Sequence, residues 1–168
     1  AALPGATPSV AALIRSRFVS AMSGTDHLLK IQQTTDAYRS FLYDQDYTWG
    51  SNRTKSDLGW MHLQMVHGGL DLPNSRAYLG AAEDYLHYFH GVNPLGYTFL
   101  TNMASFGAGR SVNETYHAWF ADGSVWDNAA TSLYGPPPGY PTGGVNPSFA
   151  PDPSYTGPVL APPQNQPV

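Results

Sequence analysis

The feature that most restricts the fold is the concentration of proline towards the C-terminus. Eleven of the fifteen prolines lie between residue 136 and the end of the chain. In YGPPPGYPTGGVNPSF, residues 134–149, prolines remove backbone donors and glycines leave φ unrestricted, so neither a helix nor a central strand is expected. The stretch also holds Tyr134, Tyr140 and Phe149. Large rings spaced through a loop indicate a role beyond connecting two elements.

Helical periodicity is confined to the first 92 residues. Apolar residues recur at helical spacing over 9–22, from 52 or 54 to 67, and from 74 or 75 to about 90, and glycine follows each run. Between the first two helices, HLLKIQQ (27–33) reads as a short extended segment. DQDYTWGSN (44–52) reads as a loop in which Ser51 or Asn52 caps the next helix.

After Asn93-Pro94, only YTFLTNM (97–103) is expected to form a strand. We therefore predict a single domain over residues 1–168, helical over 8–92 and built of loops over 93–168, in the all-α class. A structureless run of this length is unusual in a compact domain, and it indicates a part of something larger.

The low charge of the chain excludes several functions. Charged residues make up 12% of the chain, the net charge is −4, and no basic residue follows Arg110. No Lys/Arg cluster is available to release counterions, which argues against nucleic acid as the main partner. No apolar run approaches the length of a membrane span. The absence of cysteine excludes disulfides, thiolate metal ligands and a cysteine nucleophile.

SVNETYHAWFADGSVWDN, residues 111–128, combines acids, an imidazole and indoles, which is typical of a polar-ligand site on a loop. Its candidate residues are Glu114, His117, Trp119, Asp122, Trp126 and Asp127. The spacing of Asp122 and Asp127 would also offer oxygen ligands to a structural Ca²⁺, with a solvated turn as the alternative. Trp49, before the predicted cap, is either a core anchor or a platform on which a sugar ring stacks.

Several of these stretches resemble the glycoside hydrolase family 9 cellulases. WGSN (49–52) is similar to a characteristic element of that family, and DYLHYFHGVNPLGYTFLTN (84–102) is similar to its "DYxxGxNPxxxSFVTG" helix and turn. GGVNPSF (143–149) resembles its "GGPN" loop. His117 matches the histidine of a His-x-Arg substrate-binding motif, but position 119 is Trp instead of Arg. The resemblance covers about residues 40–150.

The resemblance implies an (α/α)6 toroid, to which this chain supplies the last helices and the loops of a substrate cleft. It implies a secreted enzyme that hydrolyses β-1,4-glucosidic bonds in cellulose or cello-oligosaccharides with inversion, as an endoglucanase does, and requires no cofactor. We expect the substrate-binding residues to be Trp49, His117, Trp119, Trp126 and Tyr140, with Tyr134 as a further sugar contact.

The two catalytic carboxylates of the family are missing by motif. Neither its Asp-Ala-Gly-Asp stretch nor a glutamate after the GGPN loop occurs here. The sequence therefore predicts the C-terminal part of a catalytic domain whose remainder is its partner. One alternative is a non-catalytic carbohydrate-binding or scaffolding piece. Another is a complete enzyme that uses Glu114 with Asp127 or Asp122 as acid and base.

Overall fold

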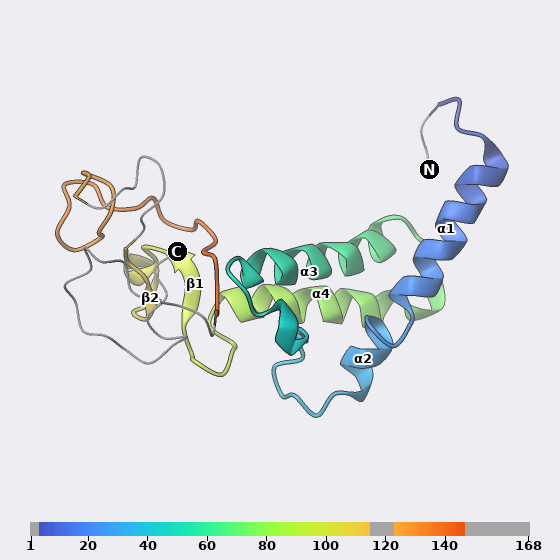
Figure 1. Cartoon of the computed structure of the whole chain (residues 1–168), viewed down its shortest axis with the longest axis horizontal. Helices are drawn as coiled ribbons and strands as arrows, with labels where there is room; N and C mark the ends of the chain where they lie inside the picture. Colours follow the sequence, from blue (N-terminus) through green and yellow to red (C-terminus); the bar gives the residue numbers. More distant parts are fainter. Residues whose placement is uncertain (1–3, 115–122, 147–168) are drawn as a thin grey trace. The chain divides into compact units, whose positions relative to one another are not determined.

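The computed structural model describes residues 4–114 and 123–146, which divide into two units (Figure 1). The helical unit comprises Ala1–Phe41 and Asp57–Tyr85, and the loop unit comprises Leu42–Ser56 and Leu86–Val168. The described residues are mostly helical with two short strands, which agrees with the predicted all-α class. None of the helices they form is long and apolar enough to cross a membrane.

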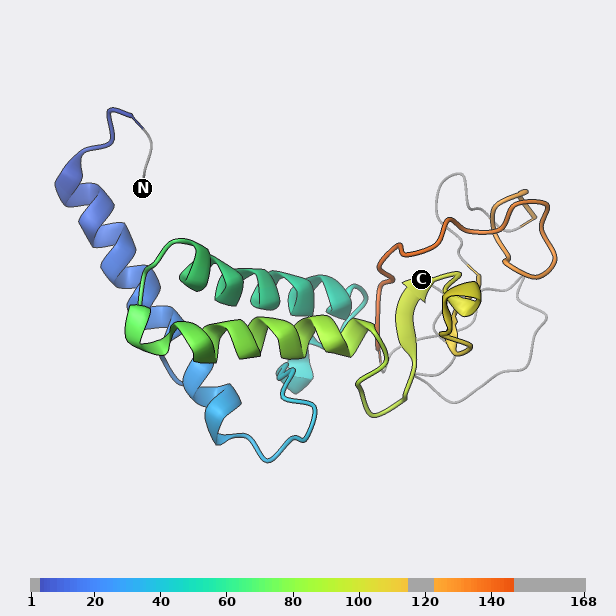
Figure 2. The ribbon, with the colours of Figure 1, turned by 180° about the vertical axis from the view of Figure 1, so that it is seen from behind.

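The helical unit contains α1 (Pro8–Met22), α2 (Leu28–Gln33) and most of α3 (Ser51–His67) and α4 (Ser75–Phe89). A 3₁₀ turn, Leu72–Asn74, leads into α4. In Figures 1 and 2, α3 and α4 lie side by side and run in opposite directions. A Cβ added to Gly59 would lie 2.9 Å from the Tyr85 Cβ, so glycine is what allows this close approach. The three helices predicted from periodicity are confirmed.

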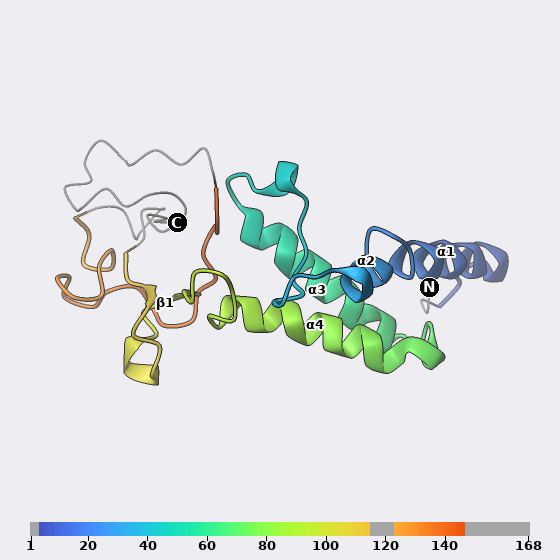
Figure 3. The same ribbon diagram turned by 90° about the horizontal axis from the view of Figure 1, so that it is seen from below.

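The core of the helical unit is formed by side chains from all four helices. Its buried members are Met22, Leu28, Ile31, Met65, Tyr78, Ala81 and Tyr85. The prediction that residues 27–33 are extended is wrong, because Leu28–Gln33 is α2. Leu28 and Ile31 are three residues apart, which places both on one helical face towards this core. Figure 3 shows α2 as a short helix that follows α1 along the ribbon. A helix of six residues is stable only through such tertiary packing, and local sequence gives no sign of it.

The loop unit has a small aromatic core of Tyr88, Phe89 and Phe99. The rings of Tyr88 and Phe99 stack with centroids 5.4 Å apart. Strand β1 (Thr98–Thr101) confirms the predicted strand and pairs in parallel with β2 (Ser111–Val112). Two 3₁₀ turns, Asp44–Asp46 and Ala104–Phe106, complete the regular structure described in this unit.

Asn93 organises the turn by which the chain leaves α4. Its buried side-chain amide donates to the carbonyl oxygens of Tyr88 and Tyr97, at 2.7 and 2.8 Å. Its Oδ1 accepts from the backbone N–H groups of Leu95 and Tyr97. Pro94 disfavours a helical conformation at Asn93, so the chain does not return to a helix and reaches β1 at Thr98 after this turn.

Candidate substrate-binding site

The first turn of α3 is bonded to the segment 142–145, and we call this contact the junction. The Ser51 hydroxyl donates to the Val145 carbonyl at 2.7 Å, and the Asn52 amide Nδ2 donates to the Thr142 carbonyl at 2.9 Å. The Asn52 backbone N–H donates to the Gly143 carbonyl at 3.0 Å. The WGSN and GGVN stretches, some ninety residues apart in the sequence, are therefore joined directly by hydrogen bonds.

The prediction that Ser51 or Asn52 caps this helix is wrong. Ser51 is the first residue of α3, and both side chains donate to carbonyl oxygens instead of accepting the first N–H groups of the helix. Both residues are buried. Their hydrogen bonds are therefore shielded from water, where an unmade bond is most costly.

Gly144 makes the junction possible. Its φ is +92°, and a Cβ added there would lie 2.4 Å from Cγ and Oδ1 of Asn52 and 2.7 Å from the Ser51 hydroxyl. Any larger residue would force the loop away from α3. Two independent requirements, a left-handed backbone and absent volume, thus select glycine at this position.

The proline-rich loop is held along β1 by hydrogen bonds of Thr101. Its backbone N–H donates to the Tyr140 carbonyl, and its carbonyl accepts from the Gly139 N–H, both at 2.9 Å. Its hydroxyl donates to the Pro137 carbonyl. Two residues before Thr101, the Phe99 carbonyl accepts a hydrogen bond from the Thr142 N–H, and directly after β1 the Asn102 side-chain amide donates to the Pro136 carbonyl. The described part of this loop, residues 134–146, has no helix and no strand, yet these hydrogen bonds hold its backbone in place.

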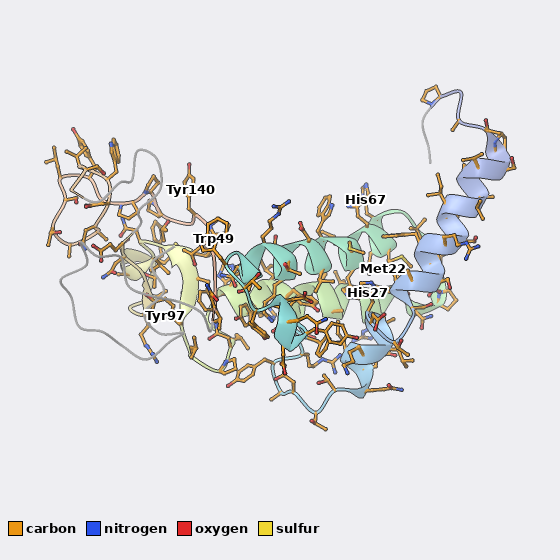
Figure 4. All side chains as sticks on the ribbon, in the orientation of Figure 1. Met22, His27, Trp49, His67, Tyr97 and Tyr140 are labelled. Atoms are coloured by element: carbon orange, nitrogen blue, oxygen red, sulfur yellow. The ribbon has the colours of Figure 1, made fainter. Side chains whose placement is uncertain are left out.

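Aromatic side chains on these segments are exposed. Trp49, directly before the junction, is 71% exposed, and Tyr140 is 53% exposed. Both side chains are labelled in Figure 4. The alternative that Trp49 is a core anchor is therefore wrong for the described structure. Trp126 and Tyr134, which precede Tyr140 in the loop unit, are also exposed and stack on each other.

A buried lysine lies one helical turn behind the junction. The Lys55 ammonium is 4.2 Å from the centre of the Tyr88 ring and 5.4 Å from that of Tyr47, and the side chain is almost fully buried. Aromatic faces attract such a cation. Burial, and secondarily Tyr47, raise the pKa of the Tyr88 phenol above its usual range, so it stays neutral. We did not predict a role for Lys55, although it shares the buried face of α3 with Asn52 and His62.

The acids of the 111–128 stretch divide between described and undescribed residues. The backbone of Glu114 pairs with that of Asn128 in an antiparallel bridge. The buried Asp127 carboxylate accepts hydrogen bonds from the Gly123 N–H and the Ser132 hydroxyl, so it closes a loop. His117, Trp119 and Asp122 lie outside the described residues.

The predicted Ca²⁺ site stays a prediction. The residues that the structure describes contain no group of three or more His, Cys, Asp or Glu side chains suited to a metal ion. Asp122, one of its two proposed ligands, is among the residues that are not described. The other, Asp127, already accepts two hydrogen bonds from its own loop.

The order of the motifs agrees with a comparison to known families. A model of glycosyl hydrolase family 9 matches residues 9–166, and the chain belongs to that family. The protein is thus a glycoside hydrolase of the cellulase type, whose substrate is a polysaccharide. No curated protein and no solved structure matches the chain significantly.

Proposed function

We propose that this chain forms one wall of the substrate cleft of an endo-acting β-1,4-glucanase that cleaves cellulose or cello-oligosaccharides with inversion and is secreted. The observation that carries the proposal is the exposure of Trp49 and Tyr140 beside a backbone held by buried hydrogen bonds. Exposed rings on a rigid support are what stacking on the flat faces of glucose units requires.

The low charge of residues 123–146 supports a neutral substrate. Between residues 123 and 146 the only charged residue is Asp127, and its carboxylate is buried within the loop. Binding a glucan there would desolvate no exposed ionic group of this segment. Burying an unpaired charge on binding is costly, so an uncharged surface favours an uncharged polymer.

The role of this chain in catalysis is to bind and orient the glucan. Inversion requires a general acid and a general base on opposite sides of the scissile bond, with carboxyl groups roughly 6.5–9.5 Å apart. Under our proposal, both are supplied by other parts of the catalytic domain. His117 donates a hydrogen bond to a sugar hydroxyl near the cleavage point, and Trp119 lines the same region.

The test is cello-oligosaccharide hydrolysis by the complete protein with Trp49→Ala and Tyr140→Ala. Loss of a stacking ring should raise KM about tenfold and change kcat less, because ground-state binding is what the ring supplies. Phe106→Ala is the matched control, since Phe106 is an exposed ring of the same unit outside the junction. Equal effects of all three substitutions would contradict the proposal.

Two further readouts separate the alternatives. Inversion at a β-linkage releases the α-anomer first, which proton NMR of the fresh product detects. If the complete protein binds cellulose but releases no sugar, the result would instead support the non-catalytic carbohydrate-binding function. The aromatic loop would be sufficient for that function without catalytic carboxylates.

A further inference from the structure

The stacked pair Trp126 and Tyr134 lies on a loop of its own, residues 123–135, which we call the platform loop. The ring centroids are 4.6 Å apart and the planes are inclined by 27°. Tyr134 is 61% exposed and Trp126 37% exposed. One face of each ring is covered by the other, and most of the Tyr134 ring remains open to solvent.

Hydrogen bonds within the platform loop fix the position of the pair. The backbone N–H groups of Tyr134 and Gly135 both donate to the Val125 carbonyl, at 3.0 and 3.2 Å. The Ser132 hydroxyl lies within hydrogen-bond distance of the Asp127 carboxylate and the Ser124 carbonyl. A ring held by its neighbour and by its backbone loses little conformational freedom when a ligand covers it.

Close backbone packing closes the base of the loop. Gly135 has a φ of +67°, and a Cβ added there would lie 2.8 Å from the Ala129 Cα. The Ala129 N–H donates to the Asn113 carbonyl at 2.7 Å, which joins the loop to the segment after β2. An exposed aromatic pair that served only as solvent-facing filler would not need a support as constrained as this.

We propose that the open face of Tyr134, braced by Trp126, binds one glucose unit of the glucan chain. The chemistry of the surface commits it to a neutral sugar. The ring offers an apolar face with a hydroxyl at its edge, and the only charge of the loop, Asp127, is turned inward. Pyranose rings combine an apolar C–H face with hydroxyl edges, which matches such a surface. The identity of the sugar as glucose rests on the proposed function.

The experiment measures the affinity of the complete protein for cellohexaose by calorimetry. Tyr134→Ala should weaken binding about tenfold, whereas Tyr134→Phe keeps the face and should bind within about twofold of wild type. Trp126→Ala should weaken binding by a smaller factor. Tyr134 would keep its backbone hydrogen bond to Val125 and lose only the stacking contact with the Trp126 ring. Thermal unfolding of each variant shows that the fold is intact.

Leu133→Ala is the matched control, because Leu133 is a 74% exposed apolar residue of the same loop without a ring. Its affinity should be unchanged. If Leu133→Ala weakens binding as much as Tyr134→Ala, or if Tyr134→Ala has no effect, the proposal that the platform loop binds a glucose unit is wrong. Loss of self-association in the Tyr134→Ala protein, with unchanged affinity, would identify a second copy of the chain as the occupant and also overturn the proposal.

Failure of this inference and failure of the proposed function give different results. If Trp49→Ala and Tyr140→Ala weaken cellohexaose binding while Tyr134→Ala does not, only the platform is rejected. If the protein binds maltohexaose and not cellohexaose, and Tyr134→Ala abolishes that binding, the platform stands and the β-1,4-glucan assignment is rejected. If no neutral oligosaccharide binds, both proposals are rejected.

Discussion

Each of the two units is stabilised internally by a different kind of interaction. The helical unit buries Met22, Ile31, Met65 and Tyr78 in one apolar cluster. On α1, by contrast, more than half of the surface of Leu13 is exposed to solvent. Among the described residues of the loop unit, the core consists of only three buried aromatic residues. This unit is instead held by side-chain bonds to distant carbonyls. The helical unit therefore depends on apolar burial, which tolerates substitution by other apolar residues. The loop unit depends on individual hydrogen bonds, which do not tolerate loss of the donor.

The largest effect is expected at Gly144. Gly144→Ala combines a strained left-handed backbone with overlap of the Asn52 side chain, and it should cost about 4 kcal/mol of stability. The measurement is chemical unfolding together with cellohexaose affinity. Gly139→Ala is the matched control, with φ of +87° and nothing within 4 Å of the added Cβ. It should cost about 1–2 kcal/mol. Equal costs would show that the junction is loosely packed.

Acid should weaken the helical unit through His62. This side chain is fully buried between the rings of Tyr78 and Tyr85, and neither ring nitrogen has a hydrogen-bond partner. Burial first, and the nearby His27 second, lower the pKa of His62 to about 4. Burial also lowers the pKa of His27, which Asp26 opposes. Asp71 faces this cluster through the Tyr78 hydroxyl.

The unfolded chain binds more protons than the native one between the ordinary histidine pKa and about 4. Stability should therefore be complete above pH 6.5 and fall by up to about 3 kcal/mol as the pH drops to 4. Unfolding curves across this range measure the slope. His62→Phe should flatten it, whereas the exposed His67, replaced by Asn, should not. An unchanged slope in His62→Phe would assign the acid sensitivity elsewhere.

Ser51→Ala and Ser16→Ala compare one hydroxyl from each unit. The buried Ser51 donates across ninety-odd residues to Val145, while Ser16 donates to Leu13 within an exposed turn of α1. Ser51→Ala should cost about 1–2 kcal/mol, because it leaves a shielded carbonyl without its donor. Ser16→Ala should stay within about 0.5 kcal/mol of wild type. Chemical unfolding of both variants measures the two costs. Similar costs would contradict the claim that the loop unit depends more strongly on individual hydrogen bonds than the helical unit does.

The smallest effect is expected at Leu13, which is 56% exposed on α1. Leu13→Ala should change the stability of this chain by less than about 0.5 kcal/mol. The same substitution in a complete toroid should cost more if another helix covers this face. Thermal unfolding of the two forms compares them, and equal small effects would argue against an (α/α)6 neighbour at α1.

Sequence reasoning identified the long helices and the motifs of the site. The helices 9–22 and 52–67 carry their own periodicity and stop signals, so local physics suffices to predict them. Trp49 and Tyr140 were predicted as sugar contacts, and the structure adds that both are exposed beside the junction. The assignment of Leu28–Gln33 failed because six residues gain their helical order only from packing against α3 and α4.

What the sequence alone determined is the class of element in each half and the order of the family motifs. Helical spacing and proline content act over a few residues, so they can be read without the fold. Only the tertiary structure decided that Ser51 bonds Val145 and Asn52 bonds Thr142. It also decided that Gly144 must be glycine, and that Lys55 and His62 are buried. Each of these depends on atoms brought together from distant parts of the chain, whose contacts no local pattern encodes.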